Sequence, residues 1–258
     1  MKKEINIVRI DGGNQIARED WVASEFPLTI ILNGQELATL LCSPKDLQYL
    51  TVGFLYSEGF IETREEITEM ILDQQKGVVR VEARGDKELS QASFLKRVIT
   101  TGCGRAIAFY HPADIDGVKE VHSDLQLSSG AVFHLTKEFQ RRSEVYRATG
   151  GVHSAALCDT KQILVFEEDI GRHNAVDKIF GKCLLEDIPT SDRIVITSGR
   201  ISSEILFKVA KRDIPVIISK SAPTDLGIIV AQDLGITLIG FARGKRMNVY
   251  AGEWRLQS

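Results

Sequence analysis

Four short segments of this sequence carry the glycine, hydroxyl and cationic residues that a phosphate-binding site needs. They are residues 167–174, 198–200, 220–224 and 242–246, and each directly follows an apolar, strand-like run. Glycines allow close approach of a ligand, arginine side chains match phosphate oxygens, and helix N-termini present free N–H groups. Because ligands bind beyond the carboxyl ends of parallel strands, all four segments should meet at one edge of a sheet. The sequence therefore predicts a site there for a phosphorylated, nucleotide-like ligand.

Taken alone, each residue of these segments also has a simpler explanation. A lone arginine such as Arg200 or Arg246 is more often part of a surface salt bridge. Hydroxyl residues that precede helices can be caps and nothing more, and this applies to Ser198, Ser202, Ser221 and Thr224. The sequence leaves open whether four further residues bind ligand or brace the loops: His153, Arg172, His173 and Asp177. The convergence of four loops nevertheless favours a ligand site that includes Ser198, Gly199, Arg200, Ser221 and Thr224.

Cys103 is the candidate reactive residue. It lies between Gly102 and Gly104 in an irregular stretch, with Arg105 and the pair at 96–97 supplying positive charge nearby. Cations and exposure favour the thiolate, which is the nucleophilic form and can attack the sulfur of another protein. The alternative is a half-buried cysteine in a turn. The other cysteines, Cys42, Cys158 and Cys183, fall on apolar runs and are expected to be buried.

The first part of the chain reads as mixed α+β. Its expected elements are a strand at 1–10, a hairpin at 28–41 around Asn33-Gly34, a helix from Ser43-Pro44 to about residue 57, a short helix at 65–72 and a strand at 77–84. Residues 100–130 are irregular, which is typical of functional segments.

The second part alternates between strands and helices. A helix at 129–148 should end at Gly150-Gly151, followed by strands at 152–157, 163–166, 193–197, 215–219 and 237–241 and helices at 174–185, 202–211 and 225–234. This order predicts an α/β fold with a largely parallel sheet covered by helices.

Composition narrows the partners. The 258 residues carry a formal net charge of -3 with a pI near 6.0, so no bulk attraction for nucleic acid or an anionic membrane is expected. No apolar run is long enough for a membrane span, and the N-terminus does not resemble a signal peptide. We therefore expect a cytoplasmic protein.

Six motifs in order identify a family resemblance. They are TTGCG (100–104), TGGVHSAAL (149–157), EEDIGRHNAVDKIFG (167–181), TSGRISSEI (197–205), SKSAPTD (219–225) and GFARGKRMNVY (240–250). With these motifs the chain resembles the FdhD/NarQ family of formate dehydrogenase accessory proteins, from about Trp21 to the C-terminus. Several motifs of this length in order are far more specific than any one short pattern.

The resemblance implies an accessory sulfurtransferase. Such a protein takes sulfur as a persulfide, here on Cys103, from a cysteine desulfurase and passes it to the molybdenum bis(molybdopterin guanine dinucleotide) cofactor that formate dehydrogenase requires. The family's cofactor-binding segment corresponds to Phe241, Ala242, Arg243, Gly244, Lys245 and Arg246. The resemblance also implies a homodimer and a three-layer cytidine-deaminase-like domain, here residues 131–258, beside a smaller α+β domain, residues 1–130.

One departure from the family pattern keeps an alternative open. The family usually has a CxxC pair on the loop of Cys103, whereas this chain has Ala106 at the second position. One cysteine suffices for a persulfide relay, but a non-catalytic chaperone that only binds the molybdenum cofactor is the alternative. A zinc hydrolase has little support, because His153 is followed by Ser154 and Ala155 and the sequence has no PCxxC pair.

Overall fold

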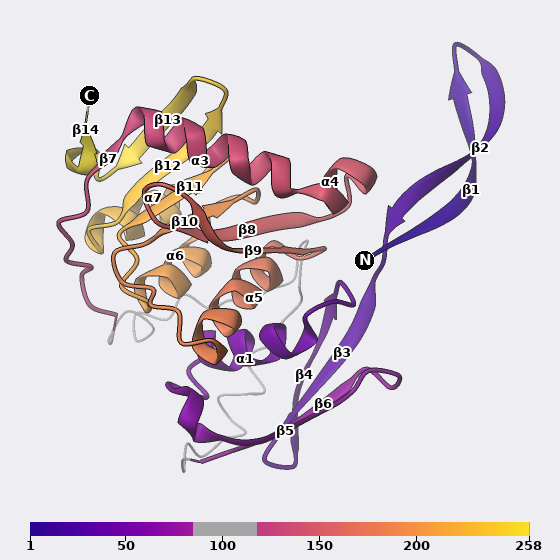
Figure 1. Ribbon diagram of the computed structural model, residues 1–258, viewed down its shortest axis with the longest axis horizontal. Coiled ribbons are helices and arrows are strands. Elements are labelled where there is room, and N and C mark those ends of the chain that lie inside the picture. Colours follow the sequence, from indigo (N-terminus) through magenta and orange to yellow (C-terminus); the bar gives the residue numbers. More distant parts are fainter. Residues whose placement is uncertain (85–117, 258) are drawn as a thin grey trace.

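The computed structural model describes residues 1–84 and 118–257. The second half of the chain forms a six-stranded sheet in the order β13-β12-β11-β10-β8-β9 (Figure 1). Its strands are β8 (His153–Cys158), β9 (Ile163–Asp169), β10 (Ile194–Thr197), β11 (Val216–Ser219), β12 (Thr237–Arg243) and β13 (Arg246–Ala251). β10, β11 and β12 are parallel neighbours, but β8, β9 and β13 pair antiparallel with theirs. The sheet is mixed and not largely parallel, because two tight turns fold β9 back on β8 and β13 back on β12.

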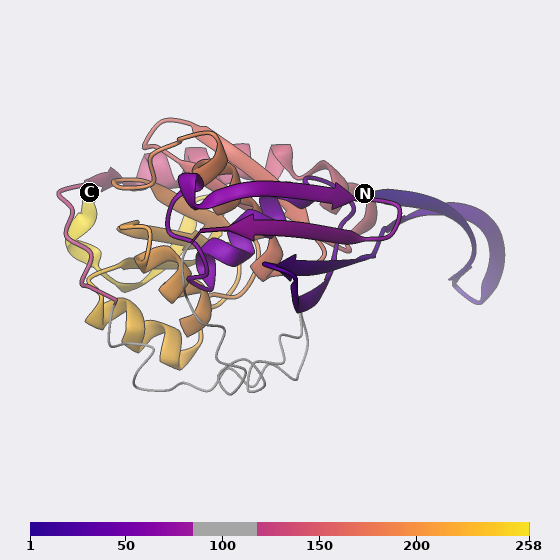
Figure 2. The same cartoon turned by 90° about the horizontal axis from the view of Figure 1, so that it is seen from below.

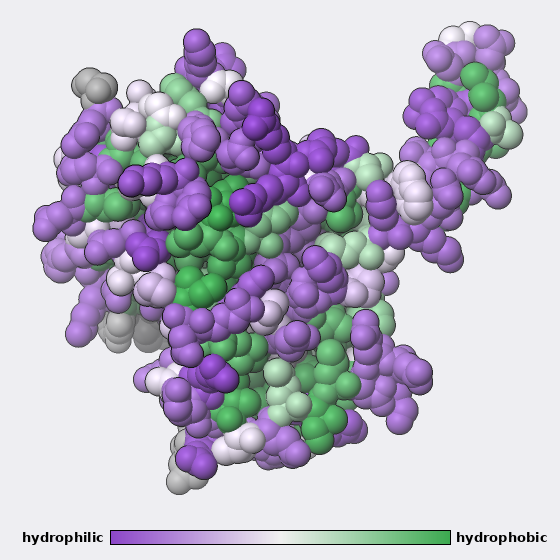
Figure 3. Space-filling model, viewed as in Figure 1, coloured by the Kyte–Doolittle hydropathy of each residue, from purple (hydrophilic) through white to green (hydrophobic). Residues whose placement is uncertain are grey.

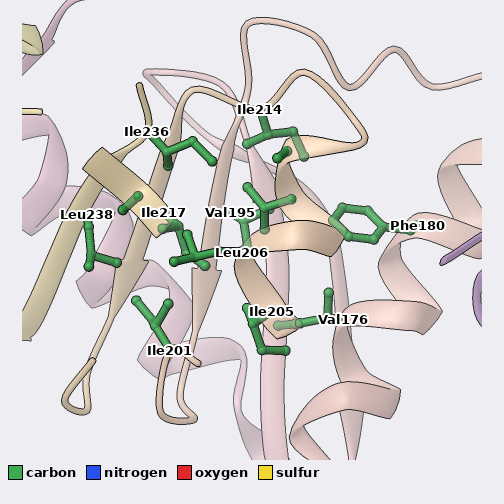
Figure 4. Packing of buried hydrophobic residues seen from close by; sticks show 14 of the residues in the cluster. Val176, Phe180, Val195, Ile201, Ile205, Leu206, Ile214, Ile217, Ile236 and Leu238 are labelled. Carbon is green, nitrogen blue, oxygen red and sulfur yellow. The ribbon is translucent and has the colours of Figure 1, made fainter. Parts of the chain in front are cut away.

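Helices cover both faces of this sheet. α3 (Ser129–Arg142) packs on one face, where Val132, Leu135 and Phe139 join apolar side chains of β10 and β11. α5 (Arg172–Leu185), α6 (Ser203–Ala210) and α7 (Asp225–Asp233) pack on the other face through the largest apolar core (Figure 4). This half of the mixed α/β protein therefore has helix, sheet and helix layers, as expected for strands buried on both faces. None of the helices in the described residues is both long and apolar enough to span a membrane.

A four-stranded sheet in the order β4-β3-β6-β5 carries α1 (Leu47–Ser57) on one face. Its strands are β3 (Phe26–Leu32), β4 (Gln35–Cys42), β5 (Ile67–Asp73) and β6 (Val78–Ala83), and Figure 2 views them from below. The predicted β3–β4 hairpin is confirmed. Asn33 and Gly34 have φ values of 48° and 76° at its turn, the positive values that a tight two-residue hairpin turn requires.

The chain begins with a hairpin that stands clear of the body. β1 (Lys2–Asp11) and β2 (Asn14–Ala23) pair along their whole length and project outward (Figures 1 and 2). Figure 3 shows hydrophilic and hydrophobic residues mixed along this arm. The arm meets the body at its base, where Ala23 lies against Gly151.

Residues 118–128 run along the second half of the molecule. Val121 N donates to the Leu234 carbonyl (2.9 Å), and β7 (Leu127–Ser128) pairs in parallel with β14 (Leu256–Gln257). Two apolar cores of the second half include residues of this segment, Val121 and Leu127. The division at residues 130 and 131 stays a prediction.

α1 and α5 cross at two glycines. A Cβ at Gly53 would lie 1.7 Å from the Asp177 carbonyl oxygen, and one at Gly181 would lie 1.9 Å from the Tyr49 carbonyl oxygen. The two helix backbones thus touch, so any side chain at these positions would force them apart. This contact joins the two halves of the protein.

A buried ion pair lies beside the same junction. Lys178 Nζ is 2.7 Å from Asp169 Oδ2, and both side chains are fully inaccessible to solvent. Asp169 also accepts hydrogen bonds from the backbone N–H groups of Ser43 and Gly171 and from Asn174 Nδ2. The carboxylate is therefore fully bonded, which offsets the large cost of burying a charge.

Two predictions for the first half are wrong: the cap and start of the helix that ends at residue 57, and the helix at 65–72. Ser43 does not cap α1, which begins four residues later, because its N–H and hydroxyl bond Asp169 and the Ile170 N–H instead. The helix expected at 65–72 is a 3-10 turn, η1 (Arg64–Glu66), followed by β5. β5 pairs with β6, and this tertiary pairing outweighs the local helical pattern.

The helix expected at 129–148 is broken at Ser143 into α3 and α4 (Glu144–Thr149). The Ser143 hydroxyl bonds the Phe139 carbonyl (3.0 Å) and lies 3.0 Å from the Ser154 hydroxyl. The Glu168 side chain accepts the N–H groups of Val145 and Tyr146, both at 3.1 Å. These bonds replace those of a continuous helix, so α4 turns toward β8 and β9.

The glycine crossing predicts that Gly53→Ala destabilises the protein. Since the added methyl group would overlap backbone, the free energy of unfolding should fall by about 3 kcal/mol in urea denaturation. The control is Gly130→Ala in α3, where a Cβ would meet nothing closer than 3.8 Å. That variant should be as stable as the parent or slightly more so. Equal losses for the two variants would contradict the crossing.

The buried ion pair predicts strong coupling between Asp169 and Lys178. Either Lys178→Met or Asp169→Asn should lower the free energy of unfolding by about 3–5 kcal/mol, because each leaves a buried charge unpaired. The double variant should lose clearly less than the two single losses added together. The exposed pair of Arg141 and Glu138, also 2.7 Å apart, serves as control, and Arg141→Met should cost less than about 1 kcal/mol. Additive losses at the buried pair would refute the coupling.

Candidate functional site

The carboxyl ends of β9, β10, β11 and β12 lie at one edge of the six-stranded sheet, as the sequence predicted. β8 runs the other way and begins at the same edge, with His153 opposite Asp169 in the ladder. We call this the strand-end edge and define it by Asp169, Thr197, Ser219 and Arg243, where those four strands end. All four loops assigned to the ligand site therefore start from it.

The loops also contact one another. The Ser219 hydroxyl donates to the Gly199 carbonyl (2.6 Å), and Lys220 N donates to the Thr197 carbonyl (3.2 Å). Phe241 N donates to the Ser221 carbonyl (3.0 Å). These bonds tie the ends of β10, β11 and β12 into one continuous surface.

The predicted site residues after β10 occupy different environments. Ser198 is half-buried, and its hydroxyl accepts the Ser154 N–H (2.9 Å) and lies 3.3 Å from His153 Nδ1. Gly199 is buried against Arg172, so a Cβ there would lie 2.8 Å from that side chain. Arg200 is exposed at the edge. Ser198 thus joins β8 to β10, and Arg200 is available to a ligand.

The hydroxyl residues after β11 separate into a cap and a loop residue. Thr224 is the N-cap of α7, and its hydroxyl accepts the Gly227 N–H (3.1 Å). Ser221 is half-buried and bonds its neighbours through its backbone, as does the half-buried Lys220. The simpler explanation, a helix cap, therefore holds for Thr224.

The segment 241–246 comprises the end of β12, the turn at residues 244–245 and the first residue of β13. Phe241 has a φ of 52°, an unusual value for an aromatic residue, where the pairing of β12 with β13 shifts register. Gly244, with a φ of 60°, makes the tight turn that brings Arg243 opposite Arg246. Ala242 is buried, whereas Arg243, Gly244, Lys245 and Arg246 are exposed.

Positively charged residues cluster at the strand-end edge. Burial lowers the pKa of His153, and the nearby Arg172 and Arg200 lower it further. Burial also lowers the pKa of Lys220, with Arg243 adding to the effect. The Arg243 Nε–H bonds the backbone carbonyl of Lys220 (3.0 Å), so the Arg243 guanidinium lies beside the Lys220 backbone. Such clustering of like charge is unfavourable alone and favours an anionic ligand.

Two of the four residues left open by the sequence brace the fold. Asp177 is buried, with its carboxylate bonded to Lys208 Nζ (2.7 Å) and the Ser57 hydroxyl (2.6 Å). His173 Nε2 lies 3.4 Å from a Glu204 carboxylate oxygen, and burial lowers the pKa of this histidine to about 3. His153 and Arg172 instead lie at the strand-end edge, beside Ser198 and Gly199.

Three cysteines are buried as predicted. Cys42, Cys158 and Cys183 are at most 2% exposed. Burial raises the pKa of Cys42 and of Cys183 to about 12, and it raises the pKa of Cys158 as well. Cys103 lies outside the described residues.

Sequence reasoning missed α4 as part of this edge. Glu168 is buried, with 8% of its surface exposed, and its carboxylate holds the start of α4 at the strand-end edge. Tyr146 of α4 has 45% of its surface exposed. The tyrosine ring lies near Lys220, with 5.9 Å from Nζ to the ring centroid. The residues that hold α4 and Tyr146 at this edge are distant in sequence. The only sequence signal for the place of Tyr146 is therefore its position shortly before Gly150-Gly151.

Comparisons with known proteins agree on one family. The family model described as FdhD/NarQ matches residues 23–257. The sulfur carrier protein FdhD of Bacillus licheniformis is 43% identical over 251 residues, which cover 97% of this chain and 95% of the relative. The protein of the same name from Bacillus subtilis is 43% identical over 252 residues, covering 98% and 96%.

A solved structure resembles the whole chain. It is a crystal structure from Desulfotalea psychrophila described as a formate dehydrogenase accessory protein, with a TM-score of 0.81 and 28% identity over 99% of both chains. The similarity thus extends from the arm to the last strand. By its sequence motifs, its family model and its relatives, this chain belongs to the FdhD/NarQ family.

Proposed function

We propose that this protein is the sulfur carrier for a formate dehydrogenase, with Cys103 as the carrying residue. It receives sulfur from a cysteine desulfurase and delivers it to the molybdenum bis(molybdopterin guanine dinucleotide) cofactor, which is the substrate held at the strand-end edge. The naming of the relatives as sulfur carrier proteins supports the general role. The observation that carries the proposal is the meeting of four loops with their cations at one edge.

The residues of the strand-end edge fit a nucleotide substrate. Arg200, Arg243, Lys245 and Arg246 are exposed and can pair with phosphate oxygens. Phe241 adds an aromatic residue in a strained conformation, of the kind that persists at functional sites. The chain's part in binding is therefore to hold the phosphates by charge and to fix the dinucleotide's position.

The chemistry assigned to Cys103 is thiol exchange. Its thiolate attacks the terminal sulfur of the donor's persulfide, a new S–S bond forms on Cys103, and the donor thiolate leaves. This step needs no second cysteine on this chain, so Ala106 is compatible with it. The other three cysteines are poor candidates, because burial and a raised pKa keep them as thiols.

The remaining features follow from the family. We propose a homodimer in the cytoplasm that associates with formate dehydrogenase, and a cytidine-deaminase-like arrangement of the second half. The second candidate function is the chaperone that binds the cofactor without transferring sulfur, and it is favoured by the presence of one cysteine where the family usually has two.

One prediction separates the carrier from the chaperone. After incubation with a cysteine desulfurase and cysteine, peptide mass spectrometry should find one extra, reductant-labile sulfur on the peptide that contains Cys103. Cys103→Ala should lose this sulfur and its support of formate dehydrogenase activity while it still binds guanine nucleotide. Cys183→Ala, which removes a buried thiol, should keep both. Full activity of Cys103→Ala would establish the chaperone instead.

Another prediction concerns ligand binding at the strand-end edge. Arg246→Ala should weaken binding of guanosine diphosphate by about tenfold, since it removes a charged partner of phosphate. The effect should shrink as salt is added, because the side chain is exposed. Lys161→Ala removes one exposed positive charge at the opposite end of the sheet and should leave the affinity unchanged. Equal affinities for both variants, measured by calorimetry, would rule out this edge as the site.

A further inference from the structure

Contacts with β8 and β9 hold the start of α4 over the strand-end edge. The Glu168 carboxylate bonds the N–H groups of Val145 and Tyr146, and the hydroxyls of Ser143 and Ser154 lie 3.0 Å apart. Ser154 in turn donates its N–H to the Ser198 hydroxyl. The helix is therefore positioned by β8, β9 and the first residue after β10.

The same bonds decide what α4 can offer a ligand. Because the Glu168 carboxylate occupies the N–H groups at the start of the helix, a phosphate would meet negative charge there. What α4 presents is the side chain of Tyr146, which is 45% exposed and packs into none of the three apolar cores. The backbone N–H of Tyr146 donates to a Glu168 carboxylate oxygen (3.1 Å), while the Tyr146 ring stays on the surface.

The ring of Tyr146 reaches across the edge. Lys220 Nζ lies 5.9 Å from the ring centroid, and Lys220 follows β11, which is separated from β8 by β10. The backbone carbonyl of Lys220 accepts the Arg243 Nε–H, so the guanidinium lies beside the backbone of the residue whose amine faces the ring. An exposed aromatic ring with two cationic residues on one side matches a ligand that carries both a base and phosphates. Stacking on such a ring is favourable for any base.

We infer that Tyr146 is the stacking platform for the purine base of the ligand, with Lys220 and Arg243 facing its phosphates. The inference rests on the proposed function, since it needs a nucleotide at the strand-end edge. In this arrangement the cations supply most of the attraction and Tyr146 supplies the preference for a nucleotide over a bare phosphate ligand.

The test compares two ligands on three variants by isothermal titration calorimetry. The ligands are guanosine diphosphate and inorganic pyrophosphate, and the variants are Tyr146→Ala, Tyr146→Phe and Trp254→Ala. Tyr146→Ala should lose about tenfold or more in affinity for guanosine diphosphate, as removal of a stacking ring does, and keep its affinity for pyrophosphate. Tyr146→Phe should bind both as the parent does. Trp254 follows β13 and is 59% exposed, so Trp254→Ala is the control for loss of an exposed aromatic ring.

The outcomes separate this inference from the function on which it rests. Parent protein that does not bind guanosine diphosphate would overturn both. Binding by the parent with an unchanged Tyr146→Ala would overturn the stacking role and leave the site standing. An equal loss of both ligands in Tyr146→Ala would also overturn it, because a ring that stacks on a base cannot account for weaker pyrophosphate binding.

Discussion

The ion pair between Asp169 and Lys178 is the interaction on which the rest of the structure depends. Asp169 ends β9, and its carboxylate bonds a lysine of α5, the start of α5 and the loop after β4. Lys178 lies one residue from Asp177, whose backbone touches Gly53 of α1. The Asp169 carboxylate therefore fixes three parts of the protein: the end of β9, α5 and the attachment of the four-stranded sheet. Because a buried charge is tolerated only when fully bonded, this geometry leaves little freedom to any of the three.

That constraint explains how one motif serves two purposes. The ligand segment 167–174 forms the first part of the motif at 167–181, but Asp169, Asn174 and Asp177 of this motif are buried and bond protein groups. Glu168 holds α4, whereas Arg172 lies against Gly199 at the strand-end edge. The buried members thus form a rigid support for the few residues that face a ligand. Such support is what keeps cations clustered at one edge despite their mutual repulsion.

Local sequence patterns predicted the elements that are determined by interactions between residues close in the sequence. Asn33-Gly34 required a hairpin turn, and the apolar runs of β10, β11 and β12 with glycines and cations after them located the strand-end edge. The misses share another cause. Ser43 fails as a helix cap because its N–H and hydroxyl bond residues about 126 positions later, Asp169 and Ile170. The helix at 129–148 breaks because Glu168 competes for its N–H groups. Contacts between residues that are distant in the sequence leave no periodic pattern, so they could not be predicted from this one sequence.

The burial of three cysteines bears directly on where sulfur can be carried. Burial raises the pKa of Cys42 and Cys183 to about 12, so both remain thiols at pH 7, and no persulfide donor could approach those buried side chains. The strand-end edge itself is built from cations, hydroxyls and aromatic rings. Binding and sulfur transfer thus require different residues, and a carrier that uses both must bring Cys103 and the cofactor together in one complex. A chaperone that only binds the cofactor has no such need.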